Sequence, residues 1–167
     1  MSDLKRITTQ FIENEDRIRL SGEVGANQTV TLWLTQRLMS RLVTNLVAWL
    51  DTQTLTNVRP EVLQEFAQGA AQARLTPQAP VLKGALDVAW LVVSVDLTSN
   101  QHVMQLAFKG TLPTEITKLN LNSTQLRQWL GIVLSQYRLA QWTLDCWPEW
   151  MKGGAFGGVS PSAGSLH

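Results

Sequence analysis

Cysteine, histidine and charged residues are all scarce in this chain of 167 residues. Only 16% of its residues are charged, against about 25% in a typical globular domain. The one cysteine, Cys146, excludes a disulfide framework within the chain. With two histidines there is also no cysteine and histidine cluster of the kind that holds structural zinc. We therefore expect a domain stabilised by its apolar core, with no metal and no cofactor.

Long apolar runs and an excess of one charge sign are also absent. The longest apolar run covers residues 88–93, well short of the roughly 20 residues that cross a bilayer. Residues 1–6 do not lead into the apolar stretch of a secretory signal. The 14 basic and 13 acidic residues lack the basic excess typical of nucleic-acid-binding proteins. These absences predict a cytoplasmic protein that binds neither membrane nor nucleic acid.

Alternation of apolar and polar residues predicts most of the strands. The strands expected from this alternation are residues 5–13, 17–21, 29–34, 101–109 and 115–121. Residues 86–97 differ because they are apolar on both faces, with Val88 and Trp90 on one side and Leu91 and Val93 on the other. Such a pattern is typical of a strand in the middle of a sheet, covered above and below.

Two segments in the first half have apolar side chains at helical spacing. Residues 35–50 carry a wide apolar stripe, and Thr35 is suited to cap the first turn of that helix. Pro60 suits the first turn of a second, alanine-rich helix that we expect to end near Arg74.

A third helix is expected from Asn122, which has capping-box spacing with Gln125, to about Leu144. Its only charges between residues 124 and 143 are Arg127 and Arg138. A helix this poor in charge is typically covered on more than one side. It shares a Thr-Gln step with the helix at residues 35–50, which we interpret as similar capping and not as a duplication.

The order of these elements predicts an α+β fold. We expect a single domain over residues 1–152, because its length is close to the ~150 residues typical of one domain. It would contain an antiparallel sheet or small β-sandwich of about six strands, with a two-helix insertion and a long C-terminal helix. Residues 153–167 form a Gly/Ser-rich tail that can bury little.

Tryptophan points to association with a protein partner. The chain has seven tryptophans, three of which (Trp142, Trp147 and Trp150) lie within nine residues toward the C-terminal end, and tryptophan is strongly enriched at interface hot spots. We expect a non-catalytic interaction protein, a homodimer or a subunit of an assembly, that binds itself or another protein. Its interface would comprise Ile132, Leu139, Trp142, Trp147, Trp150 and Met151.

Two other functions fit the same residues. One is a small apolar-ligand-binding protein whose pocket lies between sheet and helices. That pocket would be lined by Trp90, His102, Met104, Phe108 and Trp129. The other is a hydrolase with a Cys146 and His102 pair, although an inert buried thiol is the usual state of a free cysteine. We therefore expect no catalytic residues.

The layout of three strands, a two-helix insertion, three strands and a long last helix resembles the head domain of the scaffold proteins of ligase-IV end joining and of centriole assembly. The resemblance covers residues 5–144 and rests on element order. It implies a dimer formed through the helix that follows the head. Pro148 ends the helix before any heptad stalk begins, so a role in DNA repair is not implied. A separate family that shares only this layout fits equally well.

Overall fold

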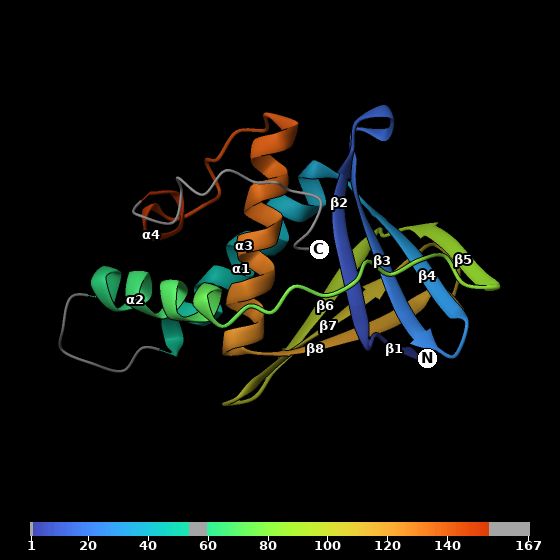
Figure 1. The fold of residues 1–167 in the computed structure, drawn as a ribbon, viewed down its shortest axis with the longest axis horizontal. Coiled ribbons are helices and arrows are strands. Elements are labelled where there is room, and N and C mark those ends of the chain that lie inside the picture. Colours follow the sequence, from blue (N-terminus) through green and yellow to red (C-terminus); the bar gives the residue numbers. More distant parts are fainter. Residues whose placement is uncertain (1, 54–59, 154–167) are drawn as a thin grey trace.

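A computed structural model describes residues 2–53 and 60–153. The fold is α+β, with two four-stranded sheets and helices packed beside them (Figure 1). Within the predicted tail, only Gly153 belongs to the described residues. The helices are α1 (Gln36–Thr52), α2 (Pro60–Ala73), α3 (Ser123–Ala140) and the short α4 (Glu149–Lys152), with a 3-10 turn at Glu13–Glu15.

The described residues form eight strands rather than about six. They are β1 (Ser2–Asp3), β2 (Arg6–Ile12), β3 (Arg17–Gly25), β4 (Gln28–Leu34), β5 (Leu86–Leu91), β6 (Ser94–Ser99), β7 (Val103–Lys109) and β8 (Ile116–Asn122). The first sheet has the order β2-β3-β4-β5 and the second the order β1-β8-β7-β6. Neighbours are antiparallel except for β1 beside β8 and β4 beside β5, which are parallel. The count differs for two reasons: β1 was not predicted, and the segment predicted as one strand at residues 86–97 is divided between the two sheets as β5 and β6.

The chain passes from one sheet to the other at two points. The Val92 N–H donates to the Trp33 carbonyl in the first sheet, and the next N–H, of Val93, donates to Lys109 in the second. The N–H groups of residues 4–5 are divided in the same way between β8 and the end of β3. These two crossings hold the sheets together and enclose the apolar core between them.

The two halves of the chain have the same topology. Each half contains four strands followed by a helix, and its first strand pairs in parallel with the last strand of the other half. Thr35, the N-cap of α1, directly follows β4. Asn122, the N-cap of α3, is the last residue of β8. The interpretation of similar capping alone is therefore incomplete, because the strands repeat as well. The shared Thr-Gln step is not itself equivalent, since Thr124 lies inside α3.

Both predicted helix caps are confirmed. The Leu38 N–H donates to Thr35 Oγ1, and Asn122 and Gln125 form the reciprocal bonds of a capping box. The predicted end of the last helix near residue 144 is wrong, because α3 ends at Ala140. Gln141 there has a left-handed backbone with φ of 57° and donates its N–H back to the last turn, which is a common way to end a helix.

The core lies between the sheets and the helices α1 and α3. Its fully buried side chains come from both halves of the chain. They include Ile18, Leu20, Leu32 and Leu34 from the first sheet, Leu106 and Phe108 from the second, Met39 and Leu46 from α1, and Leu126, Leu130 and Tyr137 from α3. Figure 1 shows α3 running along β2, with β5 on the opposite side of the first sheet.

Candidate interaction surface

The prediction that residues 86–97 form a covered central strand is wrong. β5 is the last strand of the first sheet, and β6 is the last strand of the second. Being apolar on both faces does not distinguish a central strand from an edge strand whose faces remain open. In this chain Leu86, Val88 and Leu91 of β5 are exposed, while Trp90 packs partly against the core.

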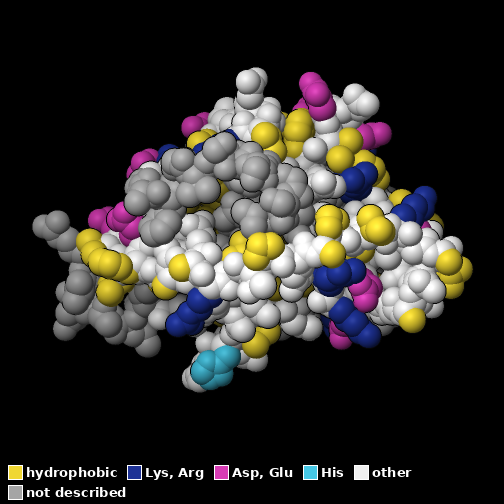
Figure 2. Space-filling view, viewed as in Figure 1, with side chains coloured by type: hydrophobic (Ala, Val, Ile, Leu, Met, Phe, Trp, Pro, Cys, Tyr) yellow, Lys and Arg dark blue, Asp and Glu magenta, His cyan; other side chains and the backbone are white. Residues whose placement is uncertain are grey.

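Apolar side chains are strongly exposed along β5 and the crossing that follows it. Leu86 is 65% exposed, Val88 61% and Val93 49%, and Leu91 is also exposed. Figure 2 shows hydrophobic side chains at the right-hand end of the molecule, where Figure 1 shows β5. We call these four side chains, together with the outward backbone of the strand, the β5 edge. Edge strands of soluble proteins usually carry charge or proline that discourages pairing, and the β5 edge has neither of them exposed.

Alternate backbone groups of β5 face away from the sheet. Leu86 donates its N–H to Asn27, and Val92 donates its N–H to Trp33, both on the β4 side. Because bonding alternates along a parallel ladder, the register with β4 directs the N–H and C=O of Asp87, Ala89 and Leu91 outward. These groups form a template for one further strand.

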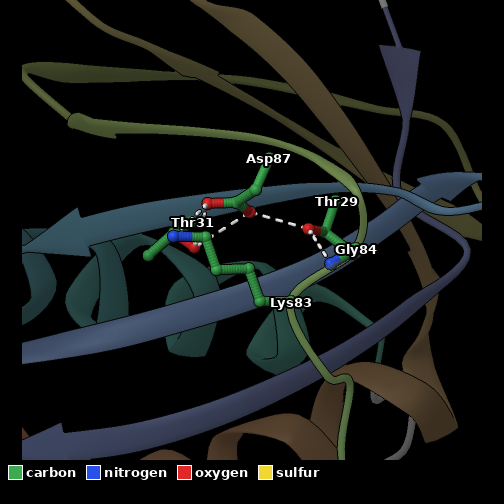
Figure 3. Close-up of polar contacts among 5 residues, drawn as sticks. All are labelled: Thr29, Thr31, Lys83, Gly84 and Asp87. Atoms are coloured by element: carbon green, nitrogen blue, oxygen red, sulfur yellow. Dashed lines mark hydrogen bonds and ion pairs between the residues drawn. The ribbon is translucent and has the colours of Figure 1, made fainter.

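The one charged residue between Gly84 and Val93 is Asp87, and its carboxylate is enclosed by the chain (Figure 3). Thr29 donates to it at 2.7 Å and Thr31 at 3.3 Å. The Asp87 side chain is 6% exposed, with the Lys83 Nζ atom 3.9 Å away. Thr29 Oγ1 also accepts the Gly84 N–H at 3.0 Å. This cluster fastens the segment before β5 to β4 and leaves the β5 edge without an exposed charge.

The opposite edge of the same sheet is covered. α3 packs along β2, where the Phe11 N–H donates to Gln136 Oε1 at 2.8 Å. Trp129 Nε1 donates to Thr9 Oγ1 at 3.0 Å. The first sheet therefore has one edge closed by its own chain and one open edge.

The residues predicted as an interface around the last helix lie in different environments. Leu139 is 50% exposed, whereas Trp147 and Met151 belong to the core of this same chain and present no surface to a partner. Ile132 is half-buried and lines a cavity beside α3. Trp142 and Trp150 are also half-buried. The structure does not bring the six residues together into one exposed patch.

Trp142 and Trp147 are occupied by aromatic contacts within the chain. Both rings meet Tyr137 edge to face, with centroid distances of 5.0 and 5.3 Å, and Trp142 also meets Phe11 at 5.4 Å. The Tyr137 hydroxyl lies 2.8 Å from Ser40 Oγ on α1. Burial raises the pKa of Tyr137 above its ordinary value. The tryptophans after α3 thus complete the core around Tyr137.

The residues predicted to line a ligand pocket do not surround one cavity. Met104 and Phe108 are buried in the core, where their side chains fill the space that a ligand would need. His102 is exposed in the turn between β6 and β7. Trp90 is half-buried on β5, and Trp129 lines the cavity beside α3. Cys146 is half-buried and its thiol interacts electrostatically with Tyr137, while His102 lies in the exposed turn.

Sequence reasoning missed a buried cation between α2 and α3. Arg127 is buried, and its Nη2 donates to Gln64 Oε1 at 2.6 Å. Gln68 Nε2 donates to the Arg127 carbonyl at 2.9 Å, and the guanidinium lies 5.6 Å from the centroid of the Trp150 ring. Burial lowers the pKa of Arg127, and the carboxylate of Asp51 opposes that shift. The signal was the repeated glutamine of α2, at positions 64 and 68.

Residues 2–53 and 60–153 contain no group of three or more His, Cys, Asp or Glu side chains placed to hold a metal ion. No helix in the described part of the chain is long and apolar enough to span a membrane. Comparison with protein-family models, curated proteins and solved structures finds no match to this chain. The resemblance of its layout to the scaffold head domains stays a prediction.

Proposed function

We propose that this protein is a non-catalytic subunit that assembles with a second copy of itself through antiparallel pairing of the two β5 strands. The observation that carries the proposal is the β5 edge, an apolar strand edge of six residues with outward backbone groups and no exposed charge. The β5 edge is a different surface from the interface around the last helix that the sequence predicted. The proposed function, non-catalytic self-association, is of the kind that the sequence predicted.

Charge supports a second copy as the occupant. In a two-fold dimer each residue near the axis meets its own counterpart, so an exposed charge at the centre of the edge would repel its copy. Asp87 is enclosed by Thr29 and Thr31, and the remaining residues between Gly84 and Val93 are uncharged. Two copies can therefore approach along this edge without repulsion between like charges.

The backbone alternation restricts the register of the pair. Only residues with outward N–H and C=O groups can exchange hydrogen bonds with a partner strand. A two-fold axis at Ala89 places Asp87 opposite Leu91 and Val88 opposite Trp90. Aromatic and β-branched side chains in such cross-strand pairs contribute roughly 0.2–1 kcal/mol each. Two four-stranded sheets would become one continuous sheet across the axis.

Sedimentation velocity of the full chain over a range of concentrations tests this proposal. We expect a monomer and dimer equilibrium for the natural sequence. Val88→Lys, which places a charge beside the axis and opposite Trp90, and Ala89→Pro, which removes an outward N–H, should each give monomers. Leu139→Lys is the matched control, because it adds the same charge at an exposed apolar residue of α3.

Two results would overturn edge pairing, and a third would exclude its register. The natural chain could stay monomeric at every concentration, which would leave the edge to a different partner. Leu139→Lys could dissociate the dimer while Val88→Lys keeps it, which would favour the α3 surface. Finally, an Ala89→Cys variant in a Cys146→Ser background could fail to form an intermolecular disulfide in a dimer that persists, which would exclude this register.

A further inference from the structure

A cavity of about 320 Å³ lies beside α3, and no residue of the β5 edge lines it. Its walls come from four parts of the chain. They are the crossing from β1 to β2, the segment that follows α2, the end of β8, and the first turns of α3. Such a volume is at the lower end of the range for small-molecule sites, about 300–1,000 Å³.

The cavity is positively charged. Lys5, Arg6 and Arg74 line it, and the described lining residues include no Asp or Glu. Arg6 is paired with Glu23 at 3.0 Å. Lys5 and Arg74 are exposed and have no ion-pair partner in the described part of the chain. Two uncompensated cations therefore face one small volume, in a protein whose net charge is only +1.

A buried donor at this wall also lacks an acceptor. Arg6 Nε is inaccessible to solvent and has no hydrogen-bond partner among the described residues. Its Nη1 reaches only the Ala79 carbonyl, at 3.4 Å. Buried polar groups normally have a partner, so the Arg6 guanidinium is incompletely paired within the described residues.

Apolar side chains form part of the lining of the cavity. Leu119, Leu121 and Trp129 are buried there, and Leu75 and Ile132 are half-buried. An inorganic anion would satisfy the cations and leave the exposed parts of Leu75 and Ile132 in contact with water. A neutral hydrocarbon would cover these apolar side chains and leave the cations unused. A ligand with an anionic head and a short apolar body matches both.

We propose that this cavity binds a short single-chain amphiphile with an anionic head group, a carboxylate or a phosphate monoester. Lys5 and Arg74 hold the head, and the hydrocarbon body lies on Trp129 and Ile132. Arginine and lysine bind both kinds of head group through charge-assisted hydrogen bonds. The site is on a different surface from the β5 edge, and the proposal does not depend on self-association.

Isothermal titration calorimetry of the full chain with three eight-carbon probes tests the site. The probes are octanoate, octyl phosphate and 1-octanol. We expect both anions to bind more tightly than 1-octanol, and the tighter of the two identifies the head group. The double variant Lys5→Gln, Arg74→Gln should weaken binding of the anions about tenfold and leave 1-octanol unchanged. The matched control is Arg37→Gln, Arg41→Gln, which removes two exposed cations from α1.

A second variant separates the site from general surface binding. Ile132→Trp fills the cavity and should abolish binding of all three probes, with the fold checked by circular dichroism. The proposal is overturned if no anion binds the natural chain at millimolar concentration. It is also overturned if 1-octanol binds as tightly as octanoate, or if the α1 control weakens octanoate as much as the cavity variant does.

Discussion

The two outer strands of the first sheet, β2 and β5, are protected very differently. β2 lies under α3, where Gln136 accepts the outward N–H of Phe11 and Trp129 donates to Thr9. β5 exposes Leu86 and other apolar side chains and directs its backbone groups into solvent. The strand that the chain covers is the one with two threonines and a glutamine in its sequence, and the strand that it leaves open is the more apolar one. Apolar content alone therefore does not decide which edge of a sheet is buried.

The edges of the second sheet sharpen the comparison. β6 carries Asp96, which pairs with Lys109 of β7, and its other exposed residues are mostly serine and threonine. β1 has only two residues. Short strands and charged residues are the usual protection of an edge. Among the four outer strands, β5 is thus the one without a covering helix, an exposed charge or a short length.

Weakening the packing of α3 on β2 should lower the free energy of unfolding the most. Trp129→Ala deletes a buried indole that packs between α3 and the strand, and truncation of a buried aromatic costs about 3–5 kcal/mol. Urea unfolding monitored by circular dichroism measures the free energy of unfolding. The milder Trp129→Phe keeps most of the packing and loses the bond to Thr9. A loss from Trp129→Ala no greater than that from Trp129→Phe would mean that the packing of α3 on β2 contributes little.

Removing the acceptor of a single backbone N–H of β2 should lower the free energy of unfolding by a smaller amount. Gln136→Met keeps the size of the side chain and removes the acceptor of the Phe11 N–H. An unsatisfied buried donor costs about 1–3 kcal/mol. Hydrogen exchange should then be faster at Phe11. Gln101→Met is the control, because Gln101 is exposed and should change neither the free energy of unfolding nor that exchange rate.

The sequence predicted the elements with local signals well. Thr35, Asn122 and Gln125 predicted both helix starts because capping is decided within four residues. Strand alternation likewise predicted β2, β4 and β7. The crossing at Val92 and Val93 could not be predicted, since adjacent residues bond to different sheets through partners far away in the chain.

The surfaces were harder to predict than the elements. The exposure of Val88 depends on which strands lie at the ends of a sheet, and periodicity does not contain that order. Trp147 was expected at an interface because tryptophan is common there, yet it packs on Tyr137 within the chain. The cavity beside α3 joins residues from both halves, such as Lys5 and Arg74. Only the tertiary fold brings them together.

The burial of Tyr137, a residue of α3, predicts how the stability of the fold changes with pH. Burial raises the pKa of this phenol, so the fold favours its neutral form. That stabilisation is complete below the unfolded-state pKa of about 10 and is lost as the pH rises above it. Tyr137→Phe should cost about 0.5–1.5 kcal/mol at neutral pH, through the lost bond to Ser40, and should reduce the loss of stability at alkaline pH.

The chain has a single tyrosine, so its ionisation can be followed directly. Tyrosinate absorbance should increase together with the loss of circular dichroism at alkaline pH, because Tyr137 ionises as the chain unfolds. An absorbance change that precedes unfolding, near the ordinary pKa of tyrosine, would contradict the burial of this side chain of α3.

The smallest effect is expected at the open edge, and it depends on protein concentration. Val88→Thr keeps a β-branched side chain, and at high dilution it should change the free energy of unfolding by no more than about 0.5 kcal/mol, as for other surface substitutions. In a dimer, the natural chain gains stability with concentration because pairing favours the folded state, and the variant should gain less because its edge buries a more polar side chain. Thermal unfolding at several concentrations distinguishes the two chains. Equal concentration dependence would mean that Val88 is not at the interface, while a large loss at high dilution would mean that β5 is covered by its own chain after all.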